Sequence, residues 1–182
     1  MKSRWMIVSL PLFAAACAGS HAEQVRDARM ERVEAQEDSQ KELVEERGAQ
    51  RKEALDQQYK AREEGVEAQD TPGTEQSAKL LELSKERSDY QSAKRTQLDK
   101  LAVRINAAQQ KLSVLGERAP TKLRGELQSA LTEHQTLQTE MGALSQVRST
   151  NWEQETKRLN ERLSGLESRV DTLDDNIEDA AD

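Results

Sequence analysis

The sequence predicts an all-α protein: a long antiparallel helical hairpin or coiled coil, with a three-helix bundle as the alternative. Of its 182 residues, 35% are hydrophobic and 34% charged, too little apolar material for the wide core of a compact globular domain. The chain contains only three prolines and eight glycines, the residues that most often interrupt helices. Long helices that each bury one narrow stripe fit both observations, and an acidic disordered chain is the other class with this composition.

The N-terminal segment predicts a secretory signal peptide at 1–16. The basic stretch Met1 to Arg4 precedes an uncharged apolar run over 5–16. A helix of that length spans about 18 Å, well short of the ~30 Å hydrocarbon core of a bilayer. A basic start, a short apolar run and small residues at its end are typical of a signal that is cleaved.

The stretch Phe13-Ala14-Ala15-Ala16-Cys17 resembles the lipobox of bacterial lipoproteins, in which small residues precede a cysteine that becomes lipidated and N-terminal. Ala14 stands where that family usually has leucine. The resemblance implies that Cys17 carries a diacylglycerol and an acyl chain such as palmitate, with 17–22 as a tether to the outer membrane on its periplasmic face. Two or more acyl chains anchor a protein stably. Cleavage after Ser20-His21-Ala22 is the alternative, and it would give a soluble periplasmic or secreted protein.

After Ala22 the chain is dense in strong helix formers, and two short segments predict turns. Thr71-Pro72-Gly73-Thr74 is typical of a tight turn. Gly116 suits the left-handed residue that ends a helix, with Pro120 following it. Helices are therefore expected over 23–69, 75–115 and 121–178.

Apolar residues recur at alternating steps of three and four on both sides of the second turn, the pattern of a coiled-coil seam. Folding the chain back at 116–120 brings the two series face to face in a single register. That register places His134, a polar seam residue, opposite Ile105. The expected seam of the hairpin comprises Leu98, Leu101, Ile105, Leu112, Leu115, Leu123, Leu127, Leu137 and Met141.

The same register extends away from the turn and predicts a two-helix rod over 75–160. It places Arg87 opposite Trp152, a pairing worth about 0.5–1 kcal/mol at an exposed site. It also places Leu80 opposite Leu159. The domain organisation expected from these patterns is a signal at 1–16, a tether at 17–22, a charged helix or spacer at 23–70, and an antiparallel hairpin with a heptad tail at 71–182.

The C-terminal segment carries the most regular heptads of the chain. Branched residues at position a with leucine at d are typical of a parallel dimer, so self-association through this tail is expected. Two other arrangements stay open: the first helix continues the rod with Tyr59 opposite Ala180, or it folds back on the hairpin as a three-helix bundle. The tail seam comprises Leu159, Leu163, Leu166, Val170, Leu173 and Ile177.

The segment 23–69 is the weakest predicted element because its apolar residues are scattered without a steady stripe. Glutamate and arginine at helical spacing favour a solvated helix supported by ion pairs of a few tenths of a kcal/mol each, and partial disorder is the alternative. Either form would act as a spacer.

Charge and residue types exclude several functions. The net charge is −7, and the 27 basic residues are interleaved with 34 acidic ones, which argues against nucleic-acid binding. The acidic pairs Glu45-Glu46, Glu63-Glu64 and Asp174-Asp175 are expected on solvated faces, because adjacent residues point to different sides of a helix. No catalytic residue, metal ligand or cofactor site is predicted, so the protein is not expected to be an enzyme.

Residues 97–182 resemble a loosely defined bacterial family of coiled-coil proteins, some labelled stress-response or apolipoprotein-like. The resemblance lies in Gln97-Leu98-Asp99-Lys100-Leu101, the proline-bearing corner, Lys122-Leu123 and Asn151-Trp152-Glu153. It implies a helical, self-associating envelope or stress-linked protein. The resulting expectation is a lipid-anchored spacer or scaffold whose envelope partners are unknown; the alternative is an apolipoprotein-like or chaperone-like binder of lipid or unfolded protein.

Overall fold

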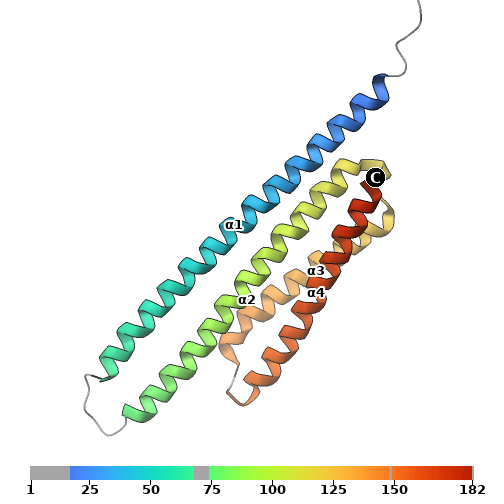
Figure 1. Ribbon diagram of the computed structural model, residues 1–182. Helices are drawn as coiled ribbons and strands as arrows, with labels where there is room; N and C mark the ends of the chain where they lie inside the picture. The colour runs from blue at the N-terminus through green and yellow to red at the C-terminus, as the bar shows by residue number, and fades with distance from the viewer. Residues whose placement is uncertain (1–16, 68–73, 148, 182) are drawn as a thin grey trace, which may run out of the picture.

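The computed structural model describes residues 17–67, 74–147 and 149–181. These residues form four α-helices: α1 (Cys17–Glu67), α2 (Thr74–Leu115), α3 (Thr121–Ala143) and α4 (Trp152–Ala181), with short 3-10 segments between them (Figure 1). The all-α fold class is confirmed. The Pro72-Gly73 turn lies outside the described residues, and the helices that flank it end at Glu67 and begin at Thr74.

The corner between α2 and α3 forms as expected. Gly116 has a φ of 58°, a left-handed conformation that costs a residue with a Cβ more than it costs glycine. A 3-10 segment, Gly116–Arg118, follows, and the Ala119 N–H donates to the Gly116 carbonyl at 3.3 Å. The Pro120 carbonyl then accepts from the Leu123 N–H at 3.0 Å and starts α3.

The predicted continuous helix over 121–178 is wrong. α3 ends at Ala143, two 3-10 segments (Leu144–Gln146 and Ser149–Asn151) reverse the chain, and α4 runs back antiparallel to α3. Three contacts between α2 and α4, including Gln97 with Glu167, each join residues 70 positions apart. A constant separation means that α4 lies parallel to α2.

This reversal buries the apolar stripe of α4 against α2 and α3. Leu159, which was expected opposite Leu80, is 2% exposed in this core, whereas Leu80 is 63% exposed, so that predicted pair is wrong. The pairing of Arg87 with Trp152 is present, with the guanidinium 4.7 Å from the ring centroid. It survives because the reversal occurs just before Trp152.

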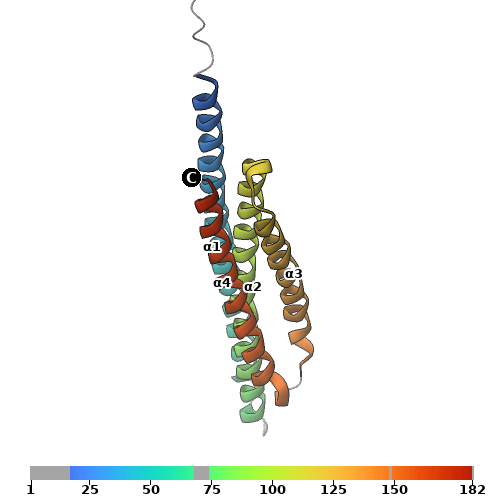
Figure 2. The ribbon, with the colours of Figure 1, turned by 90° about the vertical axis from the view of Figure 1, so that its right-hand side faces the viewer.

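Helix α1 lies antiparallel along α2, on the side away from α3 (Figures 1 and 2). The separation of paired residues falls from 55 for Glu45 and Lys100 to 25 for Tyr59 and Ser84, as an antiparallel pair requires. This position excludes the straight arrangement with Tyr59 opposite Ala180. It also means that 23–67 lies beside the bundle.

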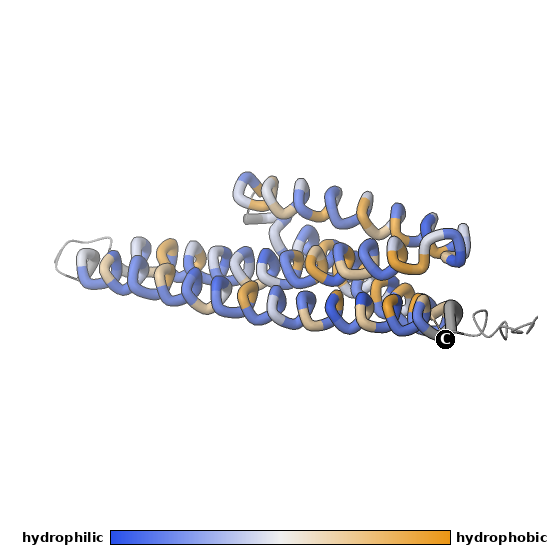
Figure 3. Tube along the Cα trace, turned by 90° about the horizontal axis from the view of Figure 1, so that it is seen from above, coloured by the Kyte–Doolittle hydropathy of each residue, from blue (hydrophilic) through white to orange (hydrophobic). Residues whose placement is uncertain are grey.

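The core is a narrow seam between α2, α3 and α4. Hydrophobic residues alternate with hydrophilic ones along each helix (Figure 3). All fifteen residues of the two predicted seams are buried, with 8% exposure or less. The tail seam, expected in a parallel dimer, is therefore covered within the chain itself.

Candidate functional site

The predicted lipidation site lies at the start of α1. Cys17 is the first residue of that helix, so the expected tether at 17–22 is helical in the structure. The predicted signal at 1–16 lies outside the described residues. The N-terminal turns of α1 extend past the α2–α3 corner and the end of α4 (Figure 1). Cys17 therefore lies at one end of the elongated part of the chain that the structure describes.

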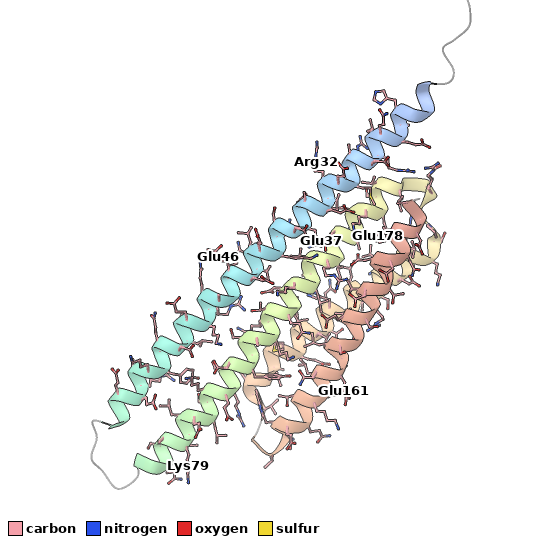
Figure 4. All side chains as sticks on the ribbon, viewed as in Figure 1. Arg32, Glu37, Glu46, Lys79, Glu161 and Glu178 are labelled. Atoms are coloured by element: carbon pink, nitrogen blue, oxygen red, sulfur yellow. The ribbon has the colours of Figure 1, made fainter. Side chains whose placement is uncertain are left out.

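Charged side chains join three helices near that same end. The set, called the polar junction below, includes glutamates of α1 and α4 that are labelled in Figure 4. It comprises Glu34, Glu37, Arg104, Lys111, Asp171, Asp174 and Glu178.

Lys111 of α2 links α1 to α4 within the polar junction. Its side chain is only 5% exposed, and its Nζ lies 3.8 Å from Glu34 Oε1 and 3.8 Å from Glu178 Oε1. A buried ammonium needs carboxylate partners because desolvation disfavours its charge. The two glutamates supply that charge from two different helices, Glu34 from α1 and Glu178 from α4.

Arg104 bridges two carboxylates of α4. Its Nη1 lies 2.7 Å from Asp171 Oδ1, and its Nη2 lies 2.7 Å from Asp174 Oδ2. Burial alone would lower the pKa of Arg104, but the hydrogen bonds to Asp174 and Asp171 outweigh it and raise the pKa above its ordinary value. The guanidinium fork thus fixes α4 against α2.

Asp174 experiences opposing influences. Burial raises its pKa, the hydrogen bond and charge of Arg104 oppose the rise, and the nearby Glu37 carboxylate adds to it, so the pKa lies above the ordinary value. Its Oδ1 is buried without a hydrogen-bond partner. The solvated face expected for Asp174 is therefore wrong.

Glu37 and Lys111 were missed by the sequence interpretation. The Glu37 side chain is 8% exposed and pairs with Lys41 at 2.7 Å. Glu37 continues the helical steps of Met30 and Val33, and Lys111 continues those of Val103 and Ala107. A charged residue in line with an apolar stripe indicates a buried charge. A pattern that counts only apolar residues does not reveal it.

His134 is buried in the seam, as expected for a polar seam residue. Its Nε2 lies 3.0 Å from the carbonyl oxygen of Leu98, one heptad from the predicted Ile105. Among the described residues, no group of three or more histidine, cysteine, aspartate or glutamate side chains is placed to hold a metal ion.

A groove lies at the end of the molecule opposite Cys17. It is about 330 Å³ in volume, and the α2 side chains Leu80 and Leu83 in it are 63% and 49% exposed. We call it the Leu80 groove. Its lining is Tyr59, Leu80, Leu83, Ser84, Arg87, Ser88, Gln91, Leu144 and Ser145.

No described helix contains an apolar stretch that is long enough to cross a bilayer. The chain matches no family model, no curated protein and no solved structure.

Proposed function

We infer that the protein is a non-enzymatic lipoprotein, anchored by lipid on Cys17 to the periplasmic face of the outer membrane, where it serves as a spacer or scaffold for envelope partners. The observation that carries this proposal is the order of the first residues: a basic start, an apolar run over 5–16, three alanines and then the one cysteine of the sequence. A lone cysteine directly after such a run has a ready role as a lipid acceptor.

The fold is compatible with an anchored rod. α1 has 51 residues and is therefore about 76 Å long, and it lies alongside the bundle. An anchor at Cys17 would hold the α2–α3 corner and the end of α4 toward the membrane. The Leu80 groove would then face away from it.

The buried charges support a structural role. Arg104 and Lys111 are each satisfied by carboxylates of neighbouring helices. Such pairs hold helices in one relative position, and they leave few charged groups of the junction free for chemistry on a substrate.

The test is metabolic labelling with palmitate in a bacterial host, comparing the wild type with Cys17→Ser. Ser20→Ala is the matched control, because it changes a neighbouring hydroxyl and keeps the thiol. The proposal predicts label in the wild type and the control and none in Cys17→Ser, with the mature N-terminus at Cys17 by mass spectrometry. A mature N-terminus at Glu23 without lipid would instead establish ordinary cleavage and refute the anchor.

A further inference from the structure

The connection between α3 and α4 is compatible with two shapes. In the structure it reverses the chain through Leu144–Gln146 and Ser149–Asn151. Yet the segment 144–151 contains neither proline nor glycine. The Leu144 N–H still bonds to the carbonyls of Glu140 and Met141, so helical bonding continues to the start of the reversal. Val147 has an extended backbone, at φ −72° and ψ 129°.

The helical face that carries the apolar residues of α3 keeps its register through this connection, although Arg148 and Glu155 also fall on it. Leu137, Met141 and Leu144 are followed at helical spacing by Trp152 and Leu159. A straight helix over 121–181 would therefore carry the apolar residues of α3 and α4 on one face, interrupted by these two charged positions. It would be about 90 Å long.

The Leu80 groove lies where such a straight helix would pass. The groove continues the face of α2 that packs on α3, and Leu144 and Ser145 line it at the point where α3 stops. In the reversed chain, Leu80 and Leu83 stay about half exposed or more. The described residues therefore cover these two side chains less fully than the rest of that face of α2.

A single chain cannot straighten without a large loss. Leu163, Leu166, Val170, Leu173 and Ile177 are at most 1% exposed, and all five would lose their partners on α2 and α3. A second copy restores every one of these contacts if each chain inserts its α4 between α2 and α3 of the other. Exchange of an identical element is a low-cost route to a dimer.

We propose that the protein forms a domain-swapped dimer in which 144–151 becomes helical and the α4 helices are exchanged between two copies. Two long helices then cross antiparallel near residue 147. The N-terminal turns of the two α2 helices meet beside that crossing and enclose Leu80 and Leu83. The occupant of the Leu80 groove is thus a second copy of this chain, and the inference does not depend on the lipid anchor.

The decisive test is a crosslink that reports which chain supplies α4. In the full chain with Cys17→Ser, Gln97→Cys and Glu167→Cys replace a pair whose side chains are 3.3 Å apart across α2 and α4. Glu45→Cys with Lys100→Cys is the matched control, because it joins α1 to α2 and stays within one chain in either form. Protein is concentrated, warmed near its melting temperature, cooled, and its dimer fraction is collected by size exclusion with light scattering.

After treatment with a short bismaleimide, the dimer fraction should give covalent dimers on a denaturing gel for the 97/167 pair and monomers for the 45/100 pair. Monomers from both pairs would mean that two closed chains associate side by side, which would overturn the swap. A dimer that does not crosslink at 97/167 would indicate that α4 has left α2, as in a parallel dimer of tails, and would overturn it too. Absence of a dimer under these conditions also counts against it.

Substitutions at the connection and the groove give a second readout. Arg148→Pro should lower the dimer fraction at least tenfold and leave the monomer folded, because Val147 already has the extended backbone that precedes proline. Arg148→Ala, the control, should keep or raise the dimer fraction. Leu80→Ser with Leu83→Ser should reduce the dimer and leave the melting temperature of the monomer unchanged. Equal dimer fractions in all these variants would contradict the proposal.

Discussion

Arg104 of α2 donates to the carboxylate of Asp174 on α4 across a distance of 2.7 Å, and the two residues are 70 positions apart. The same separation recurs in the contact of Gln97 with Glu167. This repeated spacing defines the parallel alignment of α4 on α2, and Arg104 contributes the two-pronged contact to it through Asp171 and Asp174.

Replacing Arg104 tests that role. Arg104→Ala leaves Asp174 without its cation in a mostly buried position, so the free energy of unfolding should fall by about 3 kcal/mol. Arg104→Lys should lower the free energy of unfolding by about 1 kcal/mol, because an ammonium cannot reproduce the two-pronged contact. Arg158→Ala is the control: Arg158 is 54% exposed, and its loss should change stability by about 0.5 kcal/mol or less. Urea unfolding measures all three, and equal losses for Arg104→Ala and Arg158→Ala would contradict this role.

Asp174 predicts a specific dependence on pH. Its pKa is raised in the folded state, so the folded protein binds this proton more tightly than the unfolded chain does. The resulting contribution favours folding at low pH and is lost as pH rises through the folded pKa. As pH falls from about 7 to about 4, the unfolding free energy of the wild type should therefore rise relative to that of Asp174→Asn, which carries no titrating group at this position. A shift in the opposite direction would mean that the Arg104 ion pair dominates.

Gly48 predicts how closely α1 packs on α2. A Cβ at Gly48 would lie 2.8 Å from the side chain of Thr96, whereas a Cβ at Gly125 would meet nothing within 4 Å. Gly125→Ala should therefore stabilise the protein by about 1 kcal/mol, the usual helical gain. Gly48→Ala should stabilise the protein clearly less than Gly125→Ala does. Adding Thr96→Ala should restore the missing stabilisation, because it removes the side chain that the new Cβ meets. Hydrogen exchange of α1 amides would report the loosening directly, and identical exchange in Gly48→Ala and wild type would exclude a tight contact.

His134 predicts a contrast between two substitutions. His134→Ala leaves a void in the seam and should cost about 2 kcal/mol. His134→Leu fills the site with an apolar side chain, and the Leu98 carbonyl keeps its bond within α2, so stability should change by less than about 1 kcal/mol. Thermal unfolding distinguishes these outcomes; a large loss in His134→Leu would show that the hydrogen bond to Leu98 matters more than packing.

Much of the fold follows from local patterns. The stripes of α2, α3 and α4 were predictable because residues such as Leu98 and Leu166 recur at helical steps, and the corner was predictable because Gly116 precedes a proline. The reversal after Ala143 was not, because the segment 144–151 contains neither proline nor glycine and the helical spacing of Leu144 with Trp152 and Leu159 persists across it. The contribution that favours the reversal is the burial of the α4 stripe against α2 and α3, which is non-local and does not show in a helical pattern.

The docking of α1 on the hairpin was one of the arrangements left open, and the sequence could not select it for another physical reason. Its inward face does step at helical spacing, through Val33, Glu37, Gly48, Arg51 and Tyr59, but most of these residues are polar or small. Ion pairs such as Arg51 with Asp99, at 3.4 Å, take the place of a hydrophobic stripe. A pattern of this kind becomes visible only when charge and size are considered together with hydrophobicity.

The most direct test of the anchored rod measures the distance of each end from a membrane. Lipidated protein is reconstituted in vesicles, where lipid blocks the Cys17 thiol, and a donor dye is placed on Glu117→Cys at the corner or on Lys79→Cys at the start of α2. Energy transfer to acceptor lipids should be strong from position 117 and weak from position 79, because α1 places the corner toward Cys17 and α2 extends about 63 Å away. Equal transfer from both positions, or stronger transfer from position 79, would contradict the account.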